Sequence, residues 1–386
     1  VFDSFFLIFV MMKFPDKLKQ KLSFREENQA LRKLGNSTNL IDFSSNDYLG
    51  FAKSKVIFDE THQFLIDKNI KANGATGSRL LSGNYSLYEI VEKQISTFHQ
   101  SEMALIFNSG YDANIGFFSS VPQRGDIILF DELCHASIRD GIQLSNAKSY
   151  KFKHNNLEDL KCQIKRSKDI SSKEQEIYVV TEAVFSMDGD SPDLVKLSKI
   201  CKKNNAYLIV DEAHAVGVFG KKGCGIVQEL NLQNDVFARI ITFGKALGCH
   251  GAAILGSNQL QQYLINFARS FIYTTGLPPH SLAAIKCAYE ELLESKSKEK
   301  LQENIHYFTS EVKQLKLDFI RSDSAIQCCV ISGNETVKKI AKKLQAKGFV
   351  VKPILSPTVS EGKERLRFCL HSYNSTKEIT TILENL

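Results

Sequence analysis

The chain has 386 residues and lacks several patterns that mark common classes of protein. Its nine cysteines include no Cys-x-x-Cys pair, so the sequence indicates neither a zinc site nor a disulfide framework, and no other metal site. No apolar stretch is long enough to span a membrane, and no segment is repeated or of low complexity. These absences favour a protein of a reducing compartment, the cytoplasm, with no membrane partner.

A strong excess of one charge is also absent. The chain carries 49 basic and 43 acidic side chains, a formal net charge of +6, and its lysines are spread along the whole sequence. This distribution is typical of a solvated surface rather than of a face that binds nucleic acid. Hydrophobic residues make up 43% of the chain, which is ordinary for a globular protein of this length.

The first residues, 1–11, are mostly apolar but lack the full pattern of a signal peptide. No basic region precedes them and no small-residue cleavage site follows them. A poor signal peptide is one interpretation. We favour a non-native extension from upstream of the natural start, with Met12 as the real beginning.

Short apolar runs alternate with stretches of helical character between about residues 85 and 255. This pattern predicts a mainly parallel sheet with helices on both faces, in an α/β fold. Ligands of such sheets bind beyond the carboxyl ends of the strands. The predicted strands are Met103–Phe107, Asp126–Phe130, Ile177–Thr181, Ala206–Val210 and Ala238–Thr242.

The segments on either side of this region have a different character. Residues 15–34 predict an amphipathic helix, and residues 165–176 a polar surface connection. After a helix over residues 279–296, three strands and a helix predict a smaller α+β domain. We therefore expect an N-terminal helix and strand over residues 12–45, a large domain over residues 46–280 and a small C-terminal domain over residues 281–386.

A lysine and an aspartate follow two of the predicted strands. Lys245 lies just past an apolar run, where a lysine is costly unless it is charge-paired, neutral or covalently engaged, for example as a Schiff base. Asp211 ends another apolar run, and a protonated pyridine nitrogen is one partner that would suit it. His214, three residues further on, is placed to reach the phenolic oxygen of the same ligand.

Other polar residues past the strands each allow two interpretations. The turn at Gly110 and Tyr111 suits a phosphate at a helix N-terminus, or is a plain strand-to-helix connection. His135 either stacks on a flat ring or caps the next helix. Arg365 and Arg367 lie on one face of a predicted strand, as a receptor for a carboxylate or as surface ion pairs.

The segment Asp211–His214 spells the acidic box of a helicase family, which offers a rival function. A nucleotide hydrolase of that type needs a Gly-x-x-x-x-Gly-Lys-[Ser/Thr] loop for the phosphates. None of the three Gly-Lys pairs, which end at Lys221, Lys245 and Lys363, is followed by Ser or Thr. The missing loop argues against nucleotide hydrolysis.

Several motifs, in this order along the chain, resemble the α-oxoamine synthases, fold-type I pyridoxal-phosphate enzymes that join an amino acid to an acyl thioester with loss of CO₂. The resemblance implies a mainly parallel seven-stranded sheet in a large domain, a smaller α+β C-terminal domain, and a homodimer with active sites at its interface. The segments that carry it are Ser44–Gly50, Gly77–Gly83, Phe185–Asp190, Asp211–His214, Thr242–Gly248, Pro357–Val359 and Arg365–Arg367.

The same resemblance implies a role for each candidate residue toward pyridoxal 5'-phosphate. Lys245 would form the Schiff base and transfer the substrate proton, Asp211 would pair with the pyridine nitrogen, and His135 would stack on the ring. The implied contacts to the ring oxygen and phosphate come from Ser186, His214, Thr242, the backbone of Gly110 and Tyr111, and Thr275 toward the other subunit. The implied substrate residues are Asn46 and Arg367 for the amino-acid carboxylate, Thr358, and Arg32 for the far carboxylate of the acyl chain.

Within the family, the segment Phe43–Gly50 is most similar to the members that make 8-amino-7-oxononanoate for biotin from L-alanine and pimeloyl-CoA or a pimeloyl-carrier protein. Glycine C-acetyltransferase, 5-aminolevulinate synthase and serine palmitoyltransferase share the catalytic core and remain alternatives. Tyr85, Cys224 and the segment Lys352–Thr358 depart from the family pattern, which puts the substrate in doubt more than the chemistry. A non-catalytic scaffold is a third hypothesis, disfavoured because the lysine, the aspartate and the arginine occur together.

Overall fold

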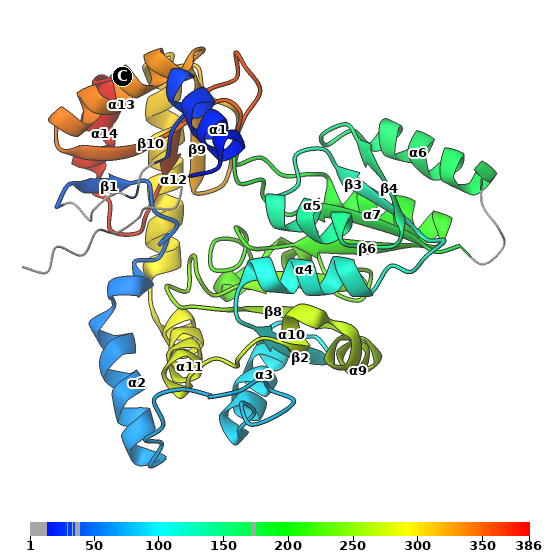
Figure 1. The fold of residues 1–386 in the computed structure, drawn as a ribbon. Helices are drawn as coiled ribbons and strands as arrows, with labels where there is room; N and C mark the ends of the chain where they lie inside the picture. The colour runs from blue at the N-terminus through cyan, green and yellow to red at the C-terminus, as the bar shows by residue number, and fades with distance from the viewer. Residues whose placement is uncertain (1–13, 29, 33, 35–38, 171–174) are drawn as a thin grey trace, which may run out of the picture.

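The structure is a computed structural model that describes residues 14–28, 30–32, 34, 39–170 and 175–386. The predicted extension at residues 1–11 lies outside the described residues. Two sheets organise the fold, and Figure 1 shows them in separate parts of the molecule. In the part of the chain that is described, no helix combines the length and apolar character needed to cross a bilayer.

The larger sheet has seven strands, as the resemblance implied. One strand, β8, runs antiparallel to both of its neighbours, and the other pairings are parallel. The prediction of a mainly parallel sheet is therefore confirmed. In spatial order the strands are β2 (Met103–Phe107), β8 (Ala252–Gly256), β7 (Ala238–Thr242), β6 (Ala206–Asp211), β5 (Ile177–Glu182), β3 (Ile127–Asp131) and β4 (Lys148–Phe152).

Helices cover both faces of this sheet because successive side chains of its strands point to opposite faces. In β2, Leu105 packs into one hydrophobic cluster, whereas its neighbours Ala104 and Ile106 pack into the other. The cluster around Leu105 includes α4 (Gly110–Ser120), α5 (Ala136–Gln143), α9 (Asn258–Phe267) and α10 (Arg269–Ile272). The opposite cluster includes α3 (Ser86–Phe98), α6 (Leu157–Ile170), α7 (Leu194–Asn204) and α11 (Pro279–Glu294).

The smaller sheet joins the two ends of the chain. Strand β1 (Ile41–Phe43) pairs in parallel with β10 (Phe349–Ile354). Strand β11 (Arg365–Cys369) then pairs antiparallel with β10 on one side and with β9 (Ile326–Val330) on the other. Three helices accompany these strands: α12 (Ser297–Gln314), α13 (Asn334–Ala346) and α14 (Thr376–Glu384). The pairing of β1 with β10 places the loop after β1 beside β11.

Two predicted segments differ from the structure. The N-terminal helix α1 is Asp16–Glu27 and ends before Arg32, because none of its residues is buried against a core that would extend it. The predicted connection over residues 165–176 is partly wrong, because α6 continues to Ile170. Its buried residues Leu160, Ile164 and Ser167 keep helical spacing through this polar stretch.

Four further elements occur in the described part of the chain, two of them between β1 and α3 and two between β6 and β7. They are η1 (Phe51–Lys53), α2 (Lys55–Asp67), η2 (Lys221–Gly223) and α8 (Ile226–Glu229). Helix α2 packs along α11, and Figure 1 shows this pair beside the large sheet.

Candidate active site

The candidate site lies where the parallel strands of the large sheet end. Glu182 ends β5, Asp211 ends β6 and Thr242 ends β7, and these strands are neighbours in the sheet. Because parallel strands present their carboxyl ends at one edge, the three side chains are brought to the same side of the molecule. Lys245 follows three residues after the last of them.

Lys245 is held close to a neutral histidine. Its Nζ lies 2.7 Å from His214 Nε2. Burial lowers the pKa of Lys245 to about 8, with Arg367 adding to the effect, whereas Asp211 and Glu182 oppose it. A lysine with a pKa near 8 has a substantial neutral fraction near neutral pH, which suits an amine that attacks an aldehyde or accepts a proton.

Asp211 is a buried carboxylate with its orientation set by hydrogen bonds. Its Oδ2 accepts from Asn114 Nδ2 at 3.0 Å, and its Oδ1 accepts from the backbone N–H of Ala213 at 2.9 Å. Asn114 Nδ2 also donates to Ser137 Oγ at 3.0 Å. A carboxylate fixed in this way suits a cationic N–H partner, such as a pyridinium nitrogen.

Glu182 is a second buried carboxyl group of the site, and the sequence did not single it out. Burial, reinforced by the charge of Asp211, raises the pKa of Glu182 to about 8. Its Oε1 accepts from the backbone N–H of His135 at 2.6 Å. The available signal was the same as for Asp211, namely an acidic residue that ends a buried strand. Glu182 thus anchors the loop that carries His135.

His135 caps a helix, which confirms one of its two interpretations. It is the N-cap of α5, and its Nδ1 accepts from the backbone N–H of Ser137 at 3.2 Å. Burial of the ring lowers the pKa of His135, and Lys245 adds to this effect, whereas Asp211 opposes it. The residue as a whole is nevertheless exposed. The cap fixes the direction of the imidazole, so it is compatible with a stacking role for the ring.

The predicted anion site lies at the N-terminus of α4 (Gly110–Ser120). Ser109 is its N-cap, and Gly110, its first residue, lies so close to Thr242 that an added Cβ would be 3.8 Å from Thr242 Oγ1. Tyr111 is exposed, and its hydroxyl donates to Asp140 at 2.7 Å. The backbone carbonyl of Thr275, an exposed residue, accepts from Asn108 Nδ2 at 2.6 Å, which ties the Thr275 segment to the loop before α4.

The two arginines of β11 have different partners. Arg365 forms an ion pair with Asp188. Among the described residues, the acceptors of Arg367 are all neutral: Ser186 O at 2.6 Å, Asn46 Oδ1 at 3.1 Å, Cys369 Sγ at 2.9 Å and the hydroxyl oxygen of Tyr48. A buried guanidinium that is held in place without an anionic partner is suited to receive a carboxylate. Arg365 is therefore engaged in an ion pair, although a buried one and not the surface pair that was expected, and the receptor interpretation fits Arg367.

The remaining two predicted substrate residues lie further out. Thr358 is exposed and lines a cavity of 770 Å³ together with His154, Asp188 and Arg365. Arg32 is exposed and is not among the described residues that line this cavity. The structure therefore brings Thr358 near the Phe185–Asp190 segment but shows no contact that links Arg32 to the site.

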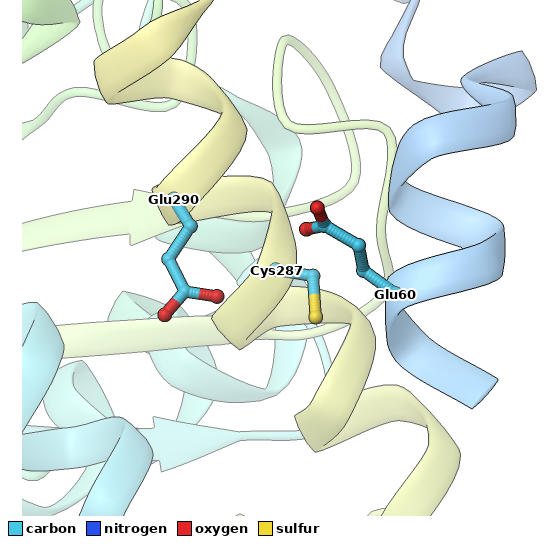
Figure 2. A group of neighbouring side chains, drawn as sticks. All are labelled: Glu60, Cys287 and Glu290. Carbon is cyan, nitrogen blue, oxygen red and sulfur yellow. The ribbon is translucent and has the colours of Figure 1, made fainter. Parts of the chain in front are cut away.

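A separate group of possible metal ligands lies between α2 and α11. Figure 2 shows Glu60 approaching Cys287 and Glu290 from the facing helix, and one ligand atom of each lies within 4.8 Å of the others. Glu290 pairs with Lys286, and the Glu60 carboxylate is exposed. We assign this group no metal, because exposed acidic side chains commonly gather without one.

Comparison with known proteins assigns the chain to a family. Residues 38–386 match the family model for class I and II aminotransferases. An 8-amino-7-oxononanoate synthase from Emericella nidulans is 39% identical over 96% of this chain and 94% of its own length. The chain belongs to the 8-amino-7-oxononanoate synthase branch of this family. Its members are pyridoxal-phosphate enzymes, so the chain is a pyridoxal-phosphate-dependent acyltransferase-type enzyme.

Solved structures of this family have the same fold. An 8-amino-7-oxononanoate synthase from Francisella tularensis is 30% identical, covers 90% of this chain and 96% of its own, and has a TM-score of 0.76. A serine palmitoyltransferase from S. paucimobilis with a bound PLP–myriocin aldimine is 25% identical, covers 96% of each chain, and has a TM-score of 0.87. The architecture is therefore that of the fold-type I pyridoxal-phosphate transferases, as the motifs implied.

Proposed function

We propose that this enzyme condenses L-alanine with a pimeloyl thioester, with loss of CO₂, to form 8-amino-7-oxononanoate for biotin biosynthesis. The names of its relatives support the reaction. The observation that carries the proposal is the placement of three groups: an amine with a pKa of about 8 on Lys245, the fixed carboxylate of Asp211, and the carboxylate receptor Arg367.

The residues present fit pyridoxal phosphate by their chemistry. Lys245 offers an amine for the aldehyde, and Asp211 offers a carboxylate to hold a proton on the pyridine nitrogen. The N–H groups at the start of α4 and the hydroxyl of Thr242 suit the phosphate. The further contacts in the proposal come from His135, Ser186, His214, Tyr111 and Thr275. When bound, the cofactor supplies an electron sink for negative charge at the α-carbon of the amino acid.

The chain's own groups then perform the binding and proton-transfer work. Arg367 and Asn46 bind the carboxylate of the amino acid and so orient its α-carbon. Lys245 Nζ accepts the α-proton, which a neutral amine with a pKa near 8 does efficiently at physiological pH. His135 Nε2, on the open side of the ring, donates a hydrogen bond to the acyl or carboxylate oxygen.

We place the acyl donor in the cavity of 770 Å³ lined by Thr358. A groove of 1210 Å³ lies next to it and shares Ser356 and Pro357 with it. Lys17, Lys21 and Arg25 of α1 line the groove, and their spacing of four residues places them on one side of the helix. Three positively charged side chains therefore face the groove that leads to the acyl cavity. This charge suits the phosphate of a pantetheine thioester, which coenzyme A and a carrier protein share. Arg32 stays in the proposal as the partner of the distal pimeloyl carboxylate.

Three further features belong to this proposal. We infer a homodimer in which Thr275 reaches the cofactor phosphate of the other subunit. We place the enzyme in a reducing compartment, the cytoplasm, which the nine free thiols of the chain support. We divide the chain into residues 12–45, 46–280 and 281–386, with residues 1–11 as a non-native extension.

A second candidate is serine palmitoyltransferase. The specific observation in its favour is the higher TM-score of the serine palmitoyltransferase structure, 0.87 against 0.76. The higher sequence identity of the 8-amino-7-oxononanoate synthases, 39% over nearly the whole chain, favours the first proposal.

The test is a matrix of substrates. Alanine, glycine and serine are each combined with pimeloyl, acetyl, succinyl and palmitoyl thioesters, with coenzyme A and with carrier protein as the carrier. We expect alanine with a pimeloyl thioester to give the highest kcat/KM. Serine with palmitoyl-CoA as the best pair would replace the proposal by the second candidate. A protein that remains colourless with pyridoxal phosphate, or that borohydride does not label on Lys245, would overturn both.

A further inference from the structure

Tyr48 lies between the lysine and the carboxylate receptor, and the roles described so far do not use it. It follows β1 in the same loop as Asn46 and is 1% exposed. Its hydroxyl oxygen lies 2.7 Å from His214 Nδ1 and 3.2 Å from Asn46 Oδ1. With the contacts of Lys245 to His214 and of Asn46 to Arg367, it completes a continuous chain of hydrogen bonds across the site.

The directions of these bonds follow from the donors available. Asn46 Oδ1 is an acceptor, because Arg367 Nη2 donates to it at 3.1 Å. The Tyr48 hydroxyl has one hydrogen and donates it to that oxygen. Its oxygen therefore accepts from His214, which carries its hydrogen on Nδ1. The lone pair of Nε2 then points to Lys245 Nζ, which donates to it at 2.7 Å.

Burial, together with the surrounding positive charges, keeps the ring of His214 neutral, so only one nitrogen carries a hydrogen. Burial holds the pKa of His214 well below its usual range, and Lys245, Arg367 and His135 add to the effect. The charged and titratable groups that act on Lys245 come from several elements. They are Asp211 and Glu182 at strand ends of the large sheet, Arg367 and Cys369 on β11, and the two histidines His135 and His214. These groups act on Lys245 through charge, whereas the hydroxyl of Tyr48 determines which nitrogen of His214 is the donor.

We propose that Tyr48 is a positioning residue that fixes the tautomer of His214, so that Nε2 accepts from Lys245 and helps this amine to retain its proton until the cofactor binds. The proposal rests on the proposed role of Lys245 as the cofactor-binding amine. It also connects the proton affinity of this amine to Asn46, a residue of the carboxylate site.

Loss of the Tyr48 hydroxyl would leave a buried Nδ1–H without an acceptor. The ring then takes the other tautomer, because a bare Nδ1 lone pair is less costly than an unpaired N–H. Its Nε2–H cannot accept from an ammonium group, so Lys245 releases its proton more easily. We expect Tyr48→Phe to lower the pKa of Lys245 by about one unit, because a hydrogen bond to a charged group has this size of effect.

The experiment measures how the cofactor-free protein captures pyridoxal phosphate as a function of pH, by absorbance. Capture needs the neutral amine, so its rate rises through the pKa of Lys245. We expect the midpoint of this rise to move down by about one pH unit in Tyr48→Phe. We expect Asn46→Ala to move it in the same direction, because the Tyr48 hydroxyl is then free to donate to His214 Nδ1.

Tyr289→Phe is the matched control. Tyr289 is also 1% exposed, and its hydroxyl lies 2.9 Å from Nε2 of another buried histidine, His99, whose carbonyl accepts from Arg239 near the amino end of β7. Removal of the Tyr289 hydroxyl also lowers the stability of the protein, but it should leave the pH midpoint of cofactor capture unchanged. An unchanged midpoint in both site variants, or an equal shift in the control, overturns the inference. Should Tyr48→Phe not fold, Asn46→Ala alone decides the outcome. Failure of the unaltered protein to capture the cofactor would instead count against the proposed function.

Discussion

Asn46 Oδ1 accepts a hydrogen bond from Arg367 Nη2 at 3.1 Å, although 321 positions separate the two residues in the chain. Asn46 lies in the loop after β1 and Arg367 lies on β11. Both strands belong to the smaller sheet, where β10 lies between them and pairs with each. The carboxylate receptor of the proposed reaction is therefore assembled from the two ends of the chain, and the strand order of the small sheet is what holds it together.

The first prediction concerns this receptor. Arg367→Lys keeps a positive charge but loses the planar, two-pronged geometry that matches a carboxylate, so we expect the dissociation constant of alanine to rise about 100-fold, the equivalent of about 2.7 kcal/mol. Spectral titration of the enzyme with alanine measures this change. Arg365→Lys, which alters the neighbouring arginine paired with Asp188, is the control and should change alanine binding much less. Unchanged alanine affinity in Arg367→Lys would remove the assignment.

The second prediction separates the two roles of His135. Asparagine is a good N-cap but has no aromatic ring, so His135→Asn should retain the stability of the protein and weaken the binding of pyridoxal phosphate. His135→Ala removes the cap as well and should lower the free energy of unfolding by about 1 kcal/mol more. Thermal unfolding and cofactor titration of the two variants provide the comparison. If His135→Asn bound the cofactor as tightly as the unaltered protein, His135 would have only its capping role and no role in binding the cofactor.

The third prediction concerns the pH dependence of stability. The pKa of Glu182 is about 8 in the folded protein, against an ordinary value of 4.5. The folded state therefore binds more protons than the unfolded state between about pH 4.5 and 8, and this carboxyl group makes the free energy of unfolding decrease as the pH rises through that window.

Glu182→Gln tests this effect, because a glutamine has the same shape, still accepts from the backbone N–H of His135, and does not titrate. We expect the decrease in stability between pH 4.5 and 8 to become smaller in the variant. Urea unfolding of the cofactor-free protein at several pH values measures it. Glu176→Gln, which alters the acidic residue just before β5, serves as the control. Parallel stability curves for the unaltered protein and Glu182→Gln would contradict the raised pKa.

The fourth prediction tests Arg32 as the partner of the distal carboxylate of the acyl chain. If it has this role, Arg32→Ala reduces kcat/KM for pimeloyl thioesters about 10-fold or more, because one charge-assisted hydrogen bond is lost, and spares heptanoyl thioesters that end in a methyl group. Arg124→Ala, another exposed arginine, is the control for a general loss of positive charge. An equal effect of Arg32→Ala on both thioesters means that Arg32 does not bind this carboxylate.

Local patterns in the sequence were sufficient to predict much of the fold. The apolar runs of β2, β3, β5, β6 and β7 were found to within one residue at each end, because a strand buried on both faces needs a continuous apolar stretch. Two strands of the large sheet were not assigned. The edge strand β4 (Lys148–Phe152) is exposed over most of its length and carries two lysines, so no pattern of burial marks it. Strand β8 follows β7 in the chain after residues 243–251, and its short run of small apolar residues was not recognised as a separate strand.

The sequence by itself determined the chemical types of the site, because Lys245, Asp211 and Thr242 each follow or end an apolar run, and burial there demands a partner. Tertiary structure alone decided which side chains meet. Tyr48 reaches His214 across 166 positions, and Glu182 lies beside Asp211 because their strands are neighbours in the sheet. The periodicity of a sequence indicates only which side of one segment is buried. The contacts named here depend instead on the order of the strands and on the packing of two sheets whose strands come from distant parts of the chain.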